Sequence, residues 1–292
     1  MISRLILILS SERSGSTLLR VMLGEHSRIV APAELFLLRY PDYRAWRAAK
    51  PEAMHSLTEY FELLDQPKTV TEIDAACAQR DTFEVYEWLF AALPPDALLL
   101  DKTPAYANRM ETLQRSLAVH PFYVWLIRHP LGVIDSHLRL KRKEHGGVRW
   151  FRRRINERIQ RLLDSGMTQL ARRREAKWVE QNRNIRDFLA TVPASQQCVI
   201  RFEELVTDPR SALAPLCQAL GLGLEPSLLS PHTKKRSMKP GIGDPNFDTH
   251  DRVDQEPAFD WKQRLSERSL TPETMEFMRQ IGVFGARVSR EG

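Results

Sequence analysis

Residues 10–19 could bind an anion. They read Ser-Ser-Glu-Arg-Ser-Gly-Ser-Thr-Leu-Leu and follow the aliphatic run Leu5–Leu9. A loop between a strand and a helix points several backbone N–H groups at one place, where an anion is stabilised. Gly15 lets the backbone approach that anion closely, and Arg13 adds a charged donor fork. The candidate anion-binding residues are Arg13, Ser14, Gly15, Ser16 and Thr17.

This loop differs from the phosphate loop of nucleoside triphosphatases. That loop has the pattern GxxxxGK[ST], and the present one lacks both the first glycine and the lysine. It can therefore cradle a phosphate but has no lysine for the β- and γ-phosphates. A generic serine-rich turn is the alternative, and such a turn would not need an arginine, a glycine and two hydroxyls in this order.

A second stretch could also bind phosphate. The apolar run Phe122–Ile127 ends on Arg128, and Ser136 follows eight residues later in a predicted helix. An arginine gives bidentate contacts to phosphate, and a nearby hydroxyl adds another donor.

Together, the two stretches resemble the donor-binding motifs of sulfotransferases. Residues 10–19 look like the 5′-phosphosulfate loop, and the Arg-Ser-Gly-Ser-Thr form is similar to tyrosylprotein sulfotransferases and bacterial relatives. Arg128 and Ser136 resemble the family's 3′-phosphate site. The resemblance implies transfer of a sulfonate from 3′-phosphoadenosine 5′-phosphosulfate (PAPS) to an acceptor hydroxyl, with adenosine 3′,5′-bisphosphate as the product.

Two residues could stabilise charge during such a transfer. Arg13 and the loop N–H groups can hold the sulfonate oxygens, because this chemistry depends mainly on positioning and charge stabilisation. Lys102 follows a candidate strand in Leu-Asp-Lys-Thr-Pro, and the carboxyl ends of parallel strands line the ligand crevice. The resemblance associates a lysine at this place with catalysis. The alternative for Lys102 is an exposed loop lysine.

Two residues are candidates for the base that removes the acceptor proton. Glu34 lies 21 residues after Arg13, the spacing of the proposed base in tyrosylprotein sulfotransferases. His250 follows Gly-Asp-Pro-Asn-Phe, which resembles sulfotransferase domains of polyketide synthases that have a histidine at this place. Histidine has a pKa suited to neutral pH, whereas a glutamate base needs burial to raise its pKa. Both remain candidates.

A late loop resembles the segment that closes over the 3′-phosphate in sulfotransferases. It reads Arg-Ser-Met-Lys-Pro-Gly from position 236. The resemblance implies cofactor contacts from Ser237, Lys239 and Gly241.

The acceptor is suggested by the same resemblance to polyketide synthase domains, which sulfonate a β-hydroxyl on a chain held by an acyl carrier protein. Carrier proteins are acidic. From Arg139 to Arg186 the chain has 16 basic and 5 acidic residues, a net charge of +11 within a total of +6. This region would attract an acidic partner. The alternative for the basic region is a solvated helix face without a partner-binding function. The alternative for the acceptor is a free alcohol or phenol.

The elements that must position these residues alternate short apolar runs with longer helical patterns. This alternation predicts an α/β fold with a P-loop-like parallel sheet flanked by helices. The expected strands are Leu5–Leu9, Arg28–Ala31, Leu98–Asp101, Phe122–Ile127 and Gln197–Phe202, and the expected helices include Ser16–Glu25, Leu131–Arg142 and Arg210–Leu220. We expect one domain over residues 1–292, with a helical insertion or lid at 39–95 and an active-site loop region at 230–261.

Composition narrows the class further. Three cysteines without a CxxC pair argue against a zinc site or a disulfide framework. The first apolar run is too short for a signal peptide, and no run is long enough to span a membrane. We therefore expect a cytoplasmic protein that uses no metal and binds neither membrane nor nucleic acid. Rival interpretations are a P-loop kinase, which would need a Walker lysine, and a nucleic-acid-binding module, which would need stacking aromatic residues.

Overall fold

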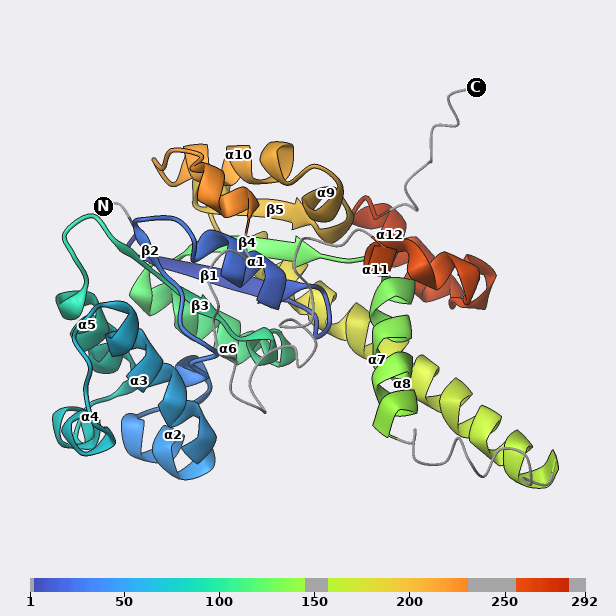
Figure 1. Cartoon of the computed structure of the whole chain (residues 1–292). Helices are drawn as coiled ribbons and strands as arrows, with labels where there is room; N and C mark the ends of the chain where they lie inside the picture. The colour runs from blue at the N-terminus through green and yellow to red at the C-terminus, as the bar shows by residue number, and fades with distance from the viewer. Residues whose placement is uncertain (1–2, 145–156, 231–255, 284–292) are drawn as a thin grey trace.

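A parallel sheet of five strands forms the centre of the protein (Figure 1). The computed structural model describes residues 3–144, 157–230 and 256–283. The strands are β1 (Leu5–Ser10), β2 (Ile29–Val30), β3 (Leu98–Lys102), β4 (Phe122–Ile127) and β5 (Gln197–Arg201). Their spatial order is β2-β3-β1-β4-β5, and every neighbouring pair is parallel. The predicted α/β fold is confirmed.

The central strands β1 and β4 are apolar and buried because helices cover both faces of the sheet. All six residues of β1 and all six of β4 are buried. Successive side chains of a strand point to opposite faces, and β1 shows this directly. Leu5, Leu7 and Leu9 belong to one hydrophobic cluster, whereas Ile6 and Ile8 belong to the other.

Different helices supply the two clusters. The cluster around Ile6 and Ile8 takes residues from α1 (Ser16–Leu23), α9 (Phe202–Thr207) and α10 (Pro209–Ala219). The cluster around Leu7 takes residues from α6 (Met110–Arg115), α7 (Pro130–Glu144), α8 (Glu157–Leu189) and α12 (Pro272–Gln280). Helices α7 and α8 pack against each other and project together from the body of the protein (Figure 1). A short helix, α11 (Glu256–Phe259), precedes the last segment.

Residues 39–95 contain four α-helices. These are α2 (Tyr43–Ala49), α3 (Met54–Leu63), α4 (Val70–Cys77) and α5 (Thr82–Ala92). Thr69 and Asp81 are the N-cap residues that precede α4 and α5. Each forms a capping box, in which side-chain and backbone groups exchange hydrogen bonds with the third residue of the helix. The buried Trp46, Tyr60 and Tyr86 of these helices belong to the same hydrophobic cluster as Leu7 of β1. The helices are therefore continuous with the core, and a lid function for them stays a prediction.

The boundaries of the predicted elements shift by a few residues. Phe202, predicted as the end of a strand, is instead the first residue of α9. β2 has two residues, Ile29 and Val30, where four were predicted. The strand from Phe122 to Ile127 begins and ends where the sequence predicts.

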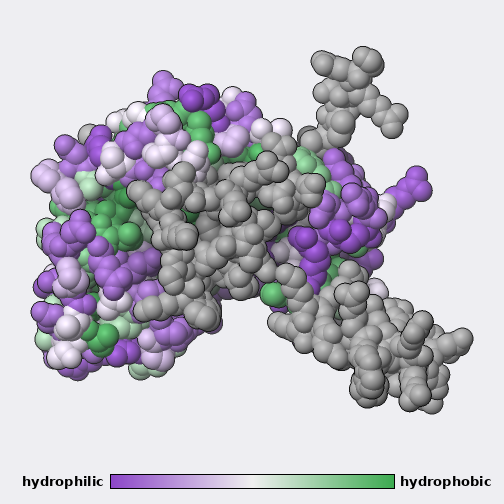
Figure 2. All heavy atoms as spheres, in the orientation of Figure 1, coloured by the Kyte–Doolittle hydropathy of each residue, from purple (hydrophilic) through white to green (hydrophobic). Residues whose placement is uncertain are grey.

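On the face drawn in Figure 2, hydrophilic side chains predominate among the coloured residues, and hydrophobic side chains gather in several places between them. Among the described residues, the exposed large hydrophobic side chains are Leu63, Val70, Leu117 and Val199, which lie on different elements. No helix in the described part of the chain has the length and apolar character to cross a membrane.

Candidate functional site

Gly15 shapes the turn from β1 into α1. Its φ of 87° lies in the left-handed region that favours glycine. A Cβ atom on Gly15 would also lie 2.2 Å from two ring carbons of Phe202. Arg13 has a φ of 63°, a conformation that costs a residue with a side chain about 1 kcal/mol. The chain thus maintains a strained loop at the place where the sequence predicts an anion site.

The hydroxyl-bearing residues of this loop are buried. Ser14, Ser16 and Thr17 have exposed fractions of 0%, 5% and 8%, and the Ser14 hydroxyl lies 2.7 Å from that of Ser11. Helix α1 begins at Ser16, and the first N–H groups of a helix have no acceptor within the helix. Backbone and hydroxyl donors are therefore close together at the end of β1.

Three predicted phosphate ligands meet at this loop. Arg13 Nε donates to Ser136 Oγ at 3.1 Å, and Arg128 Nη1 donates to the backbone oxygen of Arg13 at 3.0 Å. Arg13 and Ser136 are 123 residues apart in the sequence. The fold brings them together because β1 and β4 are neighbours and their carboxyl ends share one edge of the sheet.

Arg128 is a buried cation. Its exposed fraction is 5%, and its guanidinium lies 4.4 Å from the centre of the Phe202 ring. Burial lowers the pKa of Arg128 to about 10, and the charge of Glu203 opposes this shift. Trp178 Nε1 donates to the backbone oxygen of Arg128 at 3.0 Å. A buried guanidinium gains stability from a bound anion, so this position suits a phosphate.

The C-terminal segment holds the start of α7. Arg264 donates to both oxygens of Asp135, at 2.9 and 2.8 Å, and the rings of His129 and Trp261 stack with centres 4.3 Å apart. A Cβ atom on Gly132 would lie 2.9 Å from Arg128 Nε. Helix α7 is thereby fixed against the Arg128 side chain.

Lys102 and Glu34 form an ion pair at the other side of the same edge. Lys102 Nζ donates to Glu34 Oε1 at 2.5 Å, and the two side chains have exposed fractions of 2% and 17%. Burial lowers the pKa of Lys102, and the charge of Glu34 opposes this shift. The alternative of an exposed loop lysine is excluded. One candidate base and the candidate charge-stabilising lysine are therefore in contact.

Four predicted site residues lie outside the described part of the chain. They are Ser237, Lys239, Gly241 and His250. Their contacts with the donor, and the choice between His250 and Glu34 as the base, stay predictions.

Sequence reasoning missed the contribution of α9. Phe202 contacts both Gly15 and Arg128, and Glu203 Oε1 accepts a hydrogen bond from the backbone N–H of His129 at 3.0 Å. Phe202 is the last residue of a predicted strand and Glu203 follows it, which is the kind of position that identified Lys102. The side chain of Asp208 caps the next helix by accepting a hydrogen bond from the Ser211 N–H.

Trp178 and Asn182 have structural roles. Both are buried, and Asn182 Oδ1 accepts from Trp125 Nε1 at 3.1 Å while its amide donates to the backbone oxygen of Trp178 at 2.8 Å. Asn182 is therefore a buried amide that links α8 to β4.

The basic region is partly neutralised by ion pairs. Within the described part of α8, Arg174 pairs with Glu12, and Arg183 pairs with Glu273. The sequence from Arg142 to Ser165 has eight basic and three acidic residues, and their side chains lie outside the described set.

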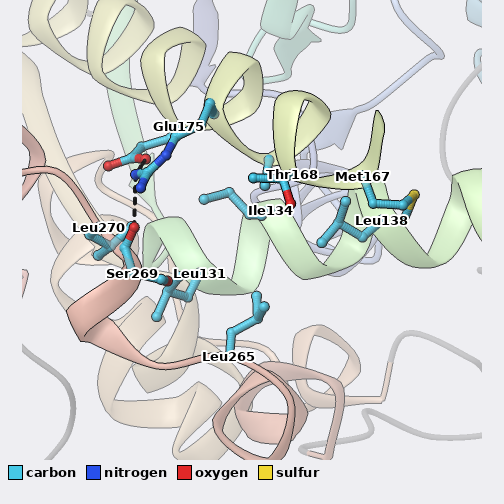
Figure 3. A pocket seen from close by; sticks show the side chains of 11 residues that line it. Leu131, Ile134, Leu138, Met167, Thr168, Glu175, Leu265, Ser269 and Leu270 are labelled. Atoms are coloured by element: carbon cyan, nitrogen blue, oxygen red, sulfur yellow. Dashed lines mark hydrogen bonds and ion pairs between the residues drawn. The ribbon is translucent and has the colours of Figure 1, made fainter. Parts of the chain in front are cut away.

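An apolar pocket of about 240 Å³ lies between α7, α8 and residues 265–270 (Figure 3). It is lined by Leu131, Ile134, Leu138, Met167, Thr168, Ala171, Arg172, Glu175, Leu265, Ser269 and Leu270. None of the predicted site residues in the described part of the chain lines it. Ile134 and Ser136 are 200° apart around an ideal helix, so the pocket faces away from the predicted phosphate ligands.

The fold agrees with comparisons to known proteins. The sulfotransferase family model matches residues 6–226, so the chain belongs to the sulfotransferase family and is a transferase by that membership. No curated protein matches the sequence.

Solved structures support the same family. The chain is 30% identical to the sulfotransferase domain from the curacin biosynthetic pathway, with a TM-score of 0.77, covering 97% of this chain and 98% of that one. It is 28% identical to the sulfotransferase domain of the Synechococcus PCC 7002 olefin synthase, with a TM-score of 0.75, covering 95% and 94%. A Mycobacterium avium sulfotransferase with 15% identity and a TM-score of 0.50, covering 96% and 77%, shares the fold.

Proposed function

We propose that this protein transfers a sulfonate group from PAPS to the β-hydroxyl of an acyl chain attached to a carrier protein. The observation that supports the donor is the meeting of Arg13, Arg128 and Ser136 at the end of β1. Two guanidinium groups and a hydroxyl fit a phosphate dianion, because charge-assisted donors bind such an anion most strongly.

PAPS would supply the activated sulfonate. In the reaction the bond between sulfur and the phosphate oxygen breaks, and a bond from sulfur to the acceptor oxygen forms. The acceptor proton moves to a base, and adenosine 3′,5′-bisphosphate leaves. No metal is required by this scheme, since the basic side chains offset the negative charge.

The residues of this chain have separate tasks in the proposal. Arg128 and Ser136 would hold the 3′-phosphate, and Arg13 with the loop N–H groups would hold the phosphosulfate. Lys102 would stabilise charge on the departing oxygen. Glu34 or His250 would accept the proton, and Ser237, Lys239 and Gly241 would add contacts to the 3′-phosphate.

The donor assignment is tested by binding. We expect adenosine 3′,5′-bisphosphate to raise the melting temperature of the protein, because a ligand that binds only the folded state stabilises it. ATP with Mg²⁺ and duplex DNA serve as comparison ligands. Stabilisation by ATP alone would favour a kinase, and stabilisation by DNA alone would favour a nucleic-acid-binding module.

The carrier-protein acceptor is supported by the likeness to domains from the curacin pathway and the olefin synthase and by the local positive charge. The exposed large hydrophobic side chains of the described residues, Leu63, Val70, Leu117 and Val199, lie on different elements. Recognition of an acidic carrier protein would therefore depend on charge and would weaken as salt concentration rises.

The acceptor test compares one β-hydroxyacyl group on a carrier protein and on free pantetheine. We expect a higher kcat/KM for the carrier-bound group and a loss of that advantage when Arg152, Arg153 and Arg154 are changed to Glu. The control changes the exposed Arg28, Arg44 and Arg210 to Glu, which alters the net charge equally. Equal kcat/KM for both acceptors, without salt dependence, would indicate a free alcohol or phenol as the acceptor.

A further inference from the structure

Asp101 is a buried carboxylate beside the predicted catalytic lysine. Its exposed fraction is 0%. Oδ2 accepts hydrogen bonds from the hydroxyls of Tyr86 at 2.6 Å and Tyr106 at 2.8 Å, and Oδ1 accepts from the Thr103 hydroxyl at 2.8 Å. Three donors to one buried carboxylate form a satisfied polar network in the core, which holds its members in one arrangement.

The network joins separate elements around the ion pair. Tyr86 lies on α5, and Tyr106 lies in the 3₁₀ turn Pro104–Asn108 that follows β3. Thr103 Oγ1 also accepts from the backbone N–H of Phe36 at 3.3 Å, two residues after Glu34. Hydrogen bonds through Thr103 therefore connect the Asp101 carboxylate both to the segment that carries Lys102 and to the segment that carries Glu34.

Strand geometry explains how this network acts on Lys102. Leu99 belongs to the hydrophobic cluster that contains the helices of residues 39–95, whereas Leu98 and Leu100 belong to the opposite cluster. Because side chains alternate along a strand, Asp101 continues the row of Leu99 and Lys102 continues the row of Leu100. The hydrogen bonds that hold Asp101 on one face of the sheet also hold the backbone of β3. They thereby set the direction in which the Lys102 side chain extends from the opposite face.

We propose that Asp101, Tyr86 and Tyr106 are positioning residues that hold the Lys102–Glu34 pair in its reactive arrangement. The inference rests on the proposed function, since it assumes that this pair takes part in sulfonate transfer. It also means that α5, through Tyr86, would help to hold the residues at the carboxyl edge of the sheet in place.

Electrostatics supports this inference. Burial and the nearby Arg20 lower the pKa of Lys102, while the charges of Glu34 and Asp101 oppose that shift. Burial raises the pKa of Asp101, with a smaller contribution from the charge of Glu34, and hydrogen bonds from its three hydroxyl partners oppose it. The tyrosines thus favour an ionised Asp101, and an ionised Asp101 favours a protonated Lys102.

The test uses Tyr86→Phe, Tyr106→Phe and the double variant. These changes remove hydroxyls and keep the rings in the core. We expect the double variant to lower kcat about tenfold or more, because a hydrogen bond to a charged group contributes roughly that factor. We expect affinity for adenosine 3′,5′-bisphosphate to stay within about twofold. In Asp101→Asn the alkaline limb of the kcat profile should move to lower pH, because Lys102 loses a favourable charge.

Matched controls are Tyr60→Phe and Tyr123→Phe. Tyr60 donates to the backbone oxygen of Leu89 at 2.6 Å, and the Tyr123 hydroxyl lies 2.8 Å from that of Ser116. Both are buried hydrogen bonds that do not touch Asp101. An equal fall in kcat for controls and test variants of equal melting temperature would overturn the inference, because it would reflect core stability alone.

A crystal structure of the double variant provides a readout that does not need activity. We expect the Lys102 ammonium to move away from Glu34 or to occupy more than one position. An unchanged pair in that structure would overturn the positioning role. Absence of transfer by the unaltered protein with PAPS would instead count against the proposed function, and the crystal structure would still decide the positioning role.

Discussion

The two sides of the sheet's carboxyl edge carry different charge arrangements. At the β1 and β4 side, Arg13 and Arg128 lie together with the hydroxyl of Ser136. At the β2 and β3 side, Lys102 is neutralised by Glu34 in a direct ion pair. The first side brings two arginines and a hydroxyl together, with the carboxylates of Glu203 and Asp135 acting on Arg128, whereas the second side pairs its lysine directly with one carboxylate.

This difference suggests that one side of the edge mainly binds the donor and the other side mainly affects turnover. A cationic side that contacts the unchanging part of the donor would bind ground state and transition state equally, which affects affinity more than turnover. A paired lysine and glutamate can respond when charge and protons move, which affects turnover. Mutations on the two sides should therefore separate into binding defects and rate defects.

The largest expected effect concerns the base. Glu34→Gln and His250→Ala are each expected to lower kcat, by about 100-fold or more for whichever residue is the base, because general base catalysis typically contributes 10²–10⁴. Single-turnover assays with labelled PAPS measure this. Wild-type turnover in both variants would mean that neither residue is the base.

Lys102→Met should lower kcat by about 100-fold, a typical cost of removing one group that stabilises developing charge. The side chain of Met has a similar length, so the core keeps its volume. Lys177→Met is the control, since Lys177 also pairs with a glutamate, at the exposed Glu180. If the substitution instead mainly lowered the affinity for the donor, Lys102 would act in donor binding, and the proposed separation of binding and rate defects would be wrong.

Arg128→Ala should weaken binding of adenosine 3′,5′-bisphosphate about 10- to 100-fold, the range for hydrogen bonds to charged groups. Calorimetry measures the affinity, and kcat at saturating PAPS should change little. Arg115→Ala is a matched control, because Arg115 also lies over an aromatic ring, that of Phe83. A loss of kcat with unchanged affinity would contradict the assignment.

The smallest effect is on stability. Burial, with the charges of Lys262 and Arg128, lowers the pKa of His129 to about 3. The unfolded chain then binds a proton near pH 6.5 that the folded protein does not, so the free energy of unfolding falls as pH drops below 6.5. We expect a loss of about 1 kcal/mol between pH 7.5 and 5.5 from this histidine.

Urea unfolding at both pH values measures this loss. His129→Gln should reduce the difference between them, and an unchanged pH dependence would mean that His129 is protonated in the folded protein. The result bears on the cationic side, because a charged His129 would add to the positive field beside Arg128.

Sequence patterns were enough to predict the parallel α/β fold and the sulfotransferase family. Both depend on local order: apolar runs of strand length predict buried strands, and motif residues follow those strands at fixed spacing. The strand Phe122–Ile127 with Arg128 at its end shows this most clearly. The same local reasoning placed Glu34 and Lys102 each after a predicted strand.

The contacts between the site residues could be identified only from the three-dimensional structure. The pairing of Lys102 with Glu34 requires β2 beside β3, and the Arg13–Ser136 bond requires β1 beside β4. Strand order is a long-range property that no local pattern encodes. The contact of Phe202 with Gly15 and the hydrogen bonds of the tyrosines to Asp101 could not be predicted for the same reason. Each contact joins segments that are far apart in the sequence, and no local pattern indicates that they meet.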